Sequence, residues 1–97
     1  MKAVKINPNK VFKMYSDPGH GWLAVPVAYL IDAGVVLCSI STYSYVRGKT
    51  IYLEEDCDAG KFISAWRAKY GSFFYENKFT DNRSPIRSYE SFCAYKP

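Results

Sequence analysis

Residues 38–66 read CSISTYSYVRGKTIYLEEDCDAGKFISAW, and this stretch decides the predicted fold. The chain around its first half is rich in aromatic and β-branched side chains, so we expect a long strand over residues 36–46. A hairpin-sized connection over residues 47–49 leads to a return strand over residues 50–55. A run of acidic residues follows, and then a helical pattern. The stretch therefore predicts a ββα unit.

The helix predicted at the end of this stretch carries a stripe of apolar side chains that would face a core. Spacings of 3, 4, 7 and 11 residues relate its members, which are Ala59, Phe62, Ile63, Trp66 and Tyr70. Asp56 or Asp58 is expected to cap the first turn of this helix, and Gly71 to end it.

The part of the chain before residue 38 has the same plan in a shorter form. Residues 11–16 and 22–25 predict two strands joined by a glycine-rich turn, and residues 26–31 predict a helix that Gly34 ends. The order ββα–ββα indicates an α+β fold, with one antiparallel sheet of about four strands and both helices on one face. We expect a shared core of Trp22, Leu30, Ile51, Leu53, Phe62, Ile63 and Trp66.

Length and composition favour a single domain over residues 1–97, since 48% of the residues are apolar and 23% are charged. A basic arm over residues 1–10 begins the chain, and a basic, aromatic, irregular tail over residues 72–97 ends it. Within that tail, residues 73–79 are compatible with a further strand. Ser84 and Pro85 form a start signal for a short last helix.

The charge is uneven: the chain has a formal net charge of +4, although residues 54–58 hold four of its nine acids. Such a basic body suits an anionic partner, while ordinary solubility would also require some net charge. The three cysteines form no CxxC pair, and we find neither a signal peptide nor an apolar run of about 20 residues. These features predict a cytoplasmic protein with reduced thiols and no membrane partner. The apolar sequence context of Cys38 predicts a buried, inert thiol.

The first candidate site, which we call the tyrosine surface, lies on the predicted hairpin and comprises Tyr43, Tyr45, Arg47, Lys49 and Tyr52. Alternation places its rings on the sheet face opposite Ile51 and Leu53. Rings beside basic side chains can stack single-stranded bases, although the consensus of RNA-recognition motifs is absent. The same residue types are typical of protein interfaces. Rings on a sheet can also stabilise it without any ligand.

The second candidate site, the acidic corner, comprises Glu54, Glu55, Asp56 and Asp58. Carboxylates between a strand and a helix can hold Mg²⁺, as nucleases require, but the Glu-x-Lys that many nucleases add is missing here. Helix N-termini attract carboxylates for capping and dipole reasons alone. We therefore expect a structural role for the corner and no metal.

The third candidate site is the glycine-rich loop that holds Asp17, His20 and Trp22. His20 is the only histidine, and beside an aspartate it could act as a general base. The nucleophile would have to be Cys38 or Cys57, and nothing in the spacing brings either close to His20. A histidine that hydrogen-bonds its own turn is the simpler expectation.

Three strings in this chain resemble a group of small proteins encoded by bacteriophages and prophages. They are DPGHGWL at residues 17–23, STYSY at residues 41–45 and YLEEDCDA at residues 52–59, within a resemblance that spans about residues 14–70. These strings identify the group, but they indicate no particular chemical activity. The resemblance implies a phage accessory protein in the bacterial cytoplasm, and such proteins often block host defence by binding.

Taken together, these observations lead us to expect a non-enzymatic binding protein without a cofactor. Its partner would be a host protein or ribonucleoprotein complex, and it would inhibit a defence system of the CRISPR or restriction type. The alternative is a small nucleic-acid-binding protein. A metal-dependent, nuclease-like enzyme that uses the acidic corner is the third hypothesis.

Overall fold

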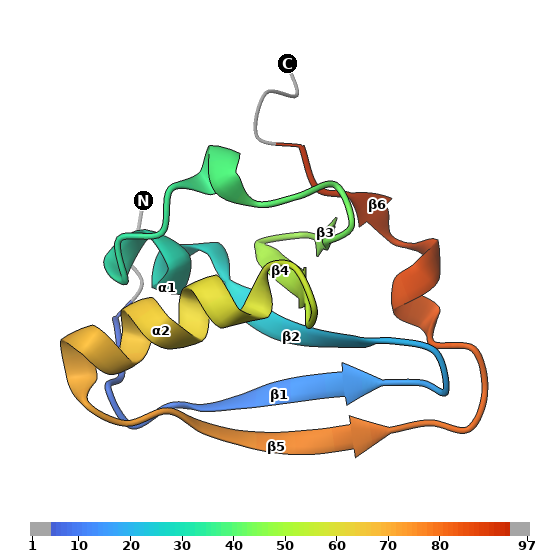
Figure 1. The fold of residues 1–97 in the computed structure, drawn as a ribbon, viewed down its shortest axis with the longest axis horizontal. Coiled ribbons are helices and arrows are strands. Elements are labelled where there is room, and N and C mark those ends of the chain that lie inside the picture. Colours follow the sequence, from blue (N-terminus) through green and yellow to red (C-terminus); the bar gives the residue numbers. More distant parts are fainter. Residues whose placement is uncertain (1–4, 94–97) are drawn as a thin grey trace.

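In the part of the chain that the structure describes, six strands form one mixed sheet in the order β5-β1-β2-β4-β3-β6 (Figure 1). The computed structural model describes residues 5–93. The strands are β1 Val11–Ser16, β2 Gly21–Pro26, β3 Tyr45–Arg47, β4 Thr50–Glu54, β5 Phe74–Phe79 and β6 Glu90–Ser91. Neighbouring strands are antiparallel, except that β1 and β5 are parallel.

Two α-helices, α1 Val27–Asp32 and α2 Ala59–Tyr70, cover the same face of the sheet (Figure 1). Two short 3₁₀ helices, η1 Leu37–Ser39 and η2 Pro85–Ser88, lie in the connections. The predicted ends are confirmed, because Gly34 and Gly71 have φ values of 83° and 86° just after the two α-helices. Only glycine enters this left-handed region readily. No helix in residues 5–93 has the length and apolar content that a membrane span requires.

The core lies between the sheet and the two helices, and aromatic rings fill its centre. The ring of Phe12 lies 5.3 Å from that of Trp66 and 5.2 Å from that of Phe62, both edge-on. Six of the seven predicted core residues are confirmed on this side, with Ile63 only partly buried. Trp22 is the exception: it is buried, but it is not among the residues of this core because its neighbour Leu23 takes the inner position.

The prediction of a strand over residues 36–46 is wrong for all but its last two residues. Residues 37–39 form η1, and residues 40–44 form a loop before β3. The cause is the serine content, because hydroxyl and backbone groups of Ser41 and Ser44 hydrogen-bond a buried carboxylate instead of a strand ladder. Cys38 is exposed, so its predicted burial is also wrong.

The prediction of about four strands is wrong because the tail adds two strands to the sheet. β5 pairs with β1, and β6 pairs with β3, so each tail strand extends one edge. Since β4 and β5 both run parallel to β1, α2 serves as a crossover that carries the chain past β2 and β1. The two ββα units are present, but the tail is part of the sheet rather than irregular. Residues 1–4 of the basic arm and residues 94–97 of the tail lie outside the described residues.

Candidate functional site

The face of the sheet opposite the helices, here called the outer face, carries aromatic side chains. Alternation puts Tyr15, Trp22 and Tyr52 on this face, because their neighbours Met14, Leu23 and Leu53 pack into the core. The C-terminal segment around η2 covers part of it. The guanidinium of Arg87 lies 5.3 Å from the ring of Trp22, and the rings of Tyr89 and Tyr52 are 5.1 Å apart.

A cleft with a volume of about 260 Å³ opens at one end of the outer face, and we call it the Trp22 cleft. Its lining comes from four separate stretches of the chain and comprises His20, Trp22, Tyr43, Tyr45, Glu54, Asp56, Cys57 and Arg87. Trp22 is 2% exposed, and its indole N–H has no hydrogen-bond partner in the described part of the chain. The cleft therefore joins residues of all three predicted sites.

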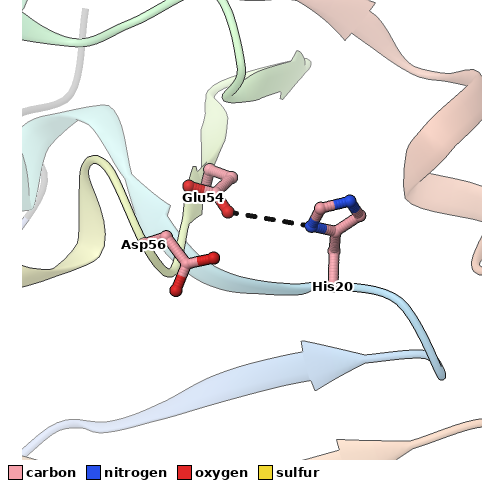
Figure 2. Close-up of side chains that lie close together, drawn as sticks. All are labelled: His20, Glu54 and Asp56. Carbon is pink, nitrogen blue, oxygen red and sulfur yellow. Dashed lines mark ion pairs between the residues drawn. The ribbon is translucent and has the colours of Figure 1, made fainter.

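His20, Glu54 and Asp56 lie together in this cleft (Figure 2). Each offers one ligand atom, and the three atoms lie within 4.8 Å of one another. Nδ1 of His20 is 3.9 Å from Oε1 of Glu54. The cause of this approach is the pairing of β2 with β4, which places Trp22 opposite Glu54 and so brings the turn before β2 to the end of β4.

Asp17 organises the turn that carries His20. Its carboxylate accepts hydrogen bonds from the backbone N–H groups of Gly19 and His20, both at 3.0 Å, and from that of Ser84 at 2.9 Å. Arg87 donates two more, at 2.6 and 2.8 Å. The Arg87 and Ser84 bonds are the main reason that the pKa of Asp17 lies far below its usual range. Asp17 is thus a structural residue that ties the turn to the C-terminal segment.

Asp58 organises the loop that carries Tyr43. Asp58 is fully buried and accepts hydrogen bonds from the hydroxyls of Ser41 and Ser44, at 2.6 and 2.5 Å, and from Nζ of Lys61 at 3.1 Å. Burial opposes its ionisation, but these bonds outweigh burial and lower its pKa. Asp58 occupies the N-cap position of α2, but its side chain makes no cap hydrogen bond, so the predicted capping role is wrong for Asp58.

The other members of the acidic corner have different tasks. Oε2 of Glu54 accepts a hydrogen bond of 2.7 Å from the backbone N–H of Cys57 and so closes the turn before α2. Asp56 is exposed at the cleft and, like Asp58, provides no side-chain cap for α2. The carboxylate of Glu55 lies beside Gly21, where a Cβ added to this glycine would come within 2.8 Å of Oε2. The acidic corner is therefore not one site, because only Glu54 and Asp56 meet in the cleft.

His20 and Cys57 both line the cleft, a proximity that their spacing in the sequence did not indicate. The thiol lacks the low pKa of a catalytic nucleophile, however. A hydrogen bond to Glu54 is the main cause that raises the pKa of Cys57, with some desolvation and the charges of the neighbouring carboxylates adding to it. A raised pKa keeps the thiol protonated, whereas a catalytic cysteine needs the thiolate.

The structure divides the tyrosine surface into two groups. Tyr43 and Tyr45 line the Trp22 cleft, and Tyr43 lies in the loop rather than on a strand. Tyr52 is half-buried and lines a second hollow of about 240 Å³ with Tyr15. The two groups are still continuous, because Tyr45 and Tyr52 are directly opposite each other on β3 and β4.

The two basic members of the tyrosine surface lie at the far end of the hairpin. Arg47 is exposed with its guanidinium 5.0 Å from the ring of Tyr89, and Lys49 is exposed in the two-residue turn. Gly48 has a φ of 59° at the first position of this turn, as glycine has in a type II′ hairpin.

Three residues of the outer face were not anticipated from the sequence: Tyr15, Arg87 and Tyr89. The alternation of β1 does place Tyr15 opposite Phe12 and Met14, so a signal for Tyr15 existed. No sequence signal placed Arg87 or Tyr89 on the sheet, because their position depends on how the chain returns over the outer face after β5.

Comparison with protein-family models, with curated proteins and with solved structures found no match.

Proposed function

We propose that this chain is a small non-enzymatic binding protein whose Tyr43 and Tyr45 make the central contact with a partner protein. The observation that carries this proposal is the exposure of Tyr43. This residue is 68% exposed, although it stands at a concave site whose walls include Tyr45 and the buried Trp22. Tyrosine and tryptophan around a pocket are the commonest centres of protein interfaces.

The rigidity of the loop supports the same proposal. The backbone N–H of Tyr43 donates to the hydroxyl of Ser41 at 3.2 Å, and that hydroxyl in turn donates to Asp58. A ring on a loop that is already ordered costs little conformational entropy when it binds.

The chemistry of the cleft supports binding rather than nucleophilic catalysis. Cys57 is the one cysteine that lines the cleft, and the raised pKa of its thiol disfavours the reactive form. Arg87 is held by Asp17, so its guanidinium acts as a fixed wall over Trp22.

The resemblance of three strings to phage and prophage proteins supports a host context. We infer a partner in the bacterial cytoplasm that is a host protein or a ribonucleoprotein complex. Inhibition of a defence complex of the CRISPR or restriction type is the activity that this context implies.

The test is capture of a partner from bacterial lysate with the parent protein and with Tyr43→Ala, in the presence of nuclease. Tyr75→Ala is the matched control, because Tyr75 is 50% exposed on the edge strand β5 and does not line the cleft. We expect the control to retain a partner that Tyr43→Ala binds about 30-fold more weakly, as the loss of a hot-spot ring of about 2 kcal/mol implies. Equal affinity of all three proteins would refute the proposal.

A second candidate function, binding of single-stranded nucleic acid, is favoured by the second hollow. Lys10 and Lys13 line it together with Tyr15 and Tyr52, and a basic groove with rings is how such proteins hold unpaired bases. Affinity for a single-stranded oligonucleotide would then fall steeply with salt. We expect Lys13→Ala to reduce the slope of log affinity against log salt by about 0.7, the value for one lost phosphate contact. A slope near zero in the parent would exclude this function.

A further inference from the structure

We propose that His20, Glu54 and Asp56 form a binding site for a divalent transition-metal ion. This inference goes beyond the proposed function, because it requires no partner protein. The three ligands come from three different positions that the fold brings together. His20 precedes β2, Glu54 ends β4, and Asp56 lies in the turn that leads to α2 (Figure 2).

Only small movements of two side chains, His20 and Asp56, would bring the three ligand atoms to metal-binding distances, because the third ligand, Glu54, is already held in place. The three ligand atoms lie within 4.8 Å of one another, whereas two ligands of a tetrahedral ion with bonds of about 2.0–2.1 Å are about 3.3 Å apart. The Glu54 carboxylate is held by its 2.7 Å bond from Cys57 N–H. His20 and Asp56 are both exposed, so their side chains can rotate inwards by the remaining distance.

The state of Glu54 is a second, independent observation that points to a cation. Its side chain is 9% exposed, and its Oε2 accepts a hydrogen bond from the backbone N–H of Cys57, which is a neutral donor. Within residues 5–93, no lysine or arginine forms an ion pair with this carboxylate, and its one ion-pair contact is with Nδ1 of His20 at 3.9 Å, which is itself a member of the proposed ligand set. Buried charges in proteins are normally paired or coordinate metals. Here a second carboxylate, Asp56, lies close by and adds repulsion that a cation would relieve.

The ligand set indicates the class of ion. One imidazole nitrogen with two carboxylate oxygens suits Zn²⁺, Fe²⁺ or Mn²⁺, whereas Mg²⁺ and Ca²⁺ prefer oxygen ligands alone. Three protein ligands leave at least one coordination position, which would face the Trp22 cleft. The expectation of no metal was formed without His20, because the sequence did not place this residue beside the acidic corner.

The test is titration of the full chain with Co²⁺, a visible probe for sites of this class. We expect about one Co²⁺ ion to bind per chain, with absorption bands typical of nitrogen and oxygen ligands. Zn²⁺ should displace the Co²⁺, whereas Mg²⁺ at the same concentration should not. His20→Gln changes an exposed residue and should lower the affinity by at least about tenfold, since even residues that only support a ligand cost that much. Glu55→Gln is the matched control from the same corner and should bind Co²⁺ as the parent does.

Three outcomes would overturn the proposal. The first is no Co²⁺ binding. The second is a thiolate-to-cobalt band, which would assign the ion to the exposed cysteines. The third is an equal loss of Co²⁺ affinity in Glu55→Gln and His20→Gln. This would mean that the ion is attracted by the general negative charge of the corner and is not bound by the three proposed ligands.

Melting temperatures of Asp56→Asn give a readout that does not depend on spectra. Without metal, this variant should melt at or above the parent, because it removes the repulsion with Glu54. With saturating Co²⁺ the parent should melt higher than the variant. A variant that melts below the parent by the same margin in both conditions would show a structural role for Asp56 and refute the site.

Discussion

At the scale of the residue, Asp17 holds two distant parts of the chain together. It accepts hydrogen bonds from Gly19 and His20 in its own turn and from Ser84 and Arg87 in the C-terminal segment. All of these donors favour the charged carboxylate, so the pKa of Asp17 lies far below its usual range. The position of His20 in the cleft and the position of Arg87 over Trp22 both depend on this one carboxylate.

This residue predicts a pH dependence of stability. Because the pKa of Asp17 is lower in the folded protein than in the unfolded chain, its stabilisation is complete above the unfolded pKa of about 4 and is lost as the pH falls below it. We expect Asp17→Asn to melt lower than the parent near neutral pH and to lose less stability between pH 5 and pH 2. Melting curves across this range, with the exposed Asp81→Asn as control, measure the difference. Parallel pH profiles of parent and Asp17→Asn would contradict the role given to Asp17.

Trp66 is the second residue on which the fold depends. It is fully buried, and its ring contacts those of Phe12, Tyr29, Phe62 and Tyr70. Trp66→Ala should lower the free energy of unfolding by about 3–5 kcal/mol, a large part of the stability of a domain of this size. Urea denaturation followed by circular dichroism measures this loss, and Phe74→Ala on the exposed edge strand should cost far less. A melting temperature within a few degrees of the parent would show that α2 does not pack as described.

At the scale of the element, the loop over residues 40–44 shows a buried polar cluster in place of a strand. The hydroxyl of Ser44 donates to Asp58 at 2.5 Å and accepts from the backbone N–H of Glu54 at 2.9 Å. One side chain thus links the loop, the end of β4 and the start of α2. The same cluster holds Tyr43 at the cleft and Glu54 at the proposed metal site.

Removal of this hydroxyl tests the link between the three elements. Ser44→Ala leaves the buried N–H of Glu54 without its partner and takes one donor from the carboxylate of Asp58, so we expect a loss of about 1–3 kcal/mol in the free energy of unfolding. Thr42→Ala, an exposed change in the same loop, is the control and should be nearly neutral. Chemical denaturation of both variants measures the contrast. Equal small losses would mean that the loop is not anchored through Ser44.

At the scale of the whole molecule, the sheet has a protected centre and two added edges. β2 and β4 are adjacent strands with a neighbour on both sides, and Leu23, Val25, Ile51 and Leu53 in them are buried. β5 and β6 are the outermost strands, and every residue of both is exposed. Local opening is easiest where few apolar contacts are lost.

Hydrogen exchange should therefore divide the molecule by position in the sheet. We expect the amides of β2 and β4 to exchange slowest. The amides of β6, and those of β5 that point away from β1, should exchange fastest. Residue-resolved exchange measured by NMR would show this order, with the amides of α2 at Phe62 and Trp66 as an internal reference for the core. Protection of β6 equal to that of β2 would contradict it.

The sequence by itself determined the elements whose signal is local. Spacing along the chain is enough to predict the helical stripe through Phe62 and Trp66 and the inner positions of Ile51 and Leu53. It is also enough to predict the glycines after both helices and the hairpin around Gly48. It also indicated the outer position of Tyr52. These features need only the geometry of one helix or one strand, so a short window of residues contains enough information.

Only the tertiary structure decided which distant residues share a site. The parallel pairing of β5 with β1, the covering of Trp22 by Arg87, and the meeting of His20 with Glu54 and Asp56 join segments that lie far apart in the chain. The same holds for the loop that replaced a predicted strand, since Asp58 captures serines 14 and 17 residues away. Pattern along the chain carries no information on such contacts, because they depend on how strands pair and how the chain returns over the sheet.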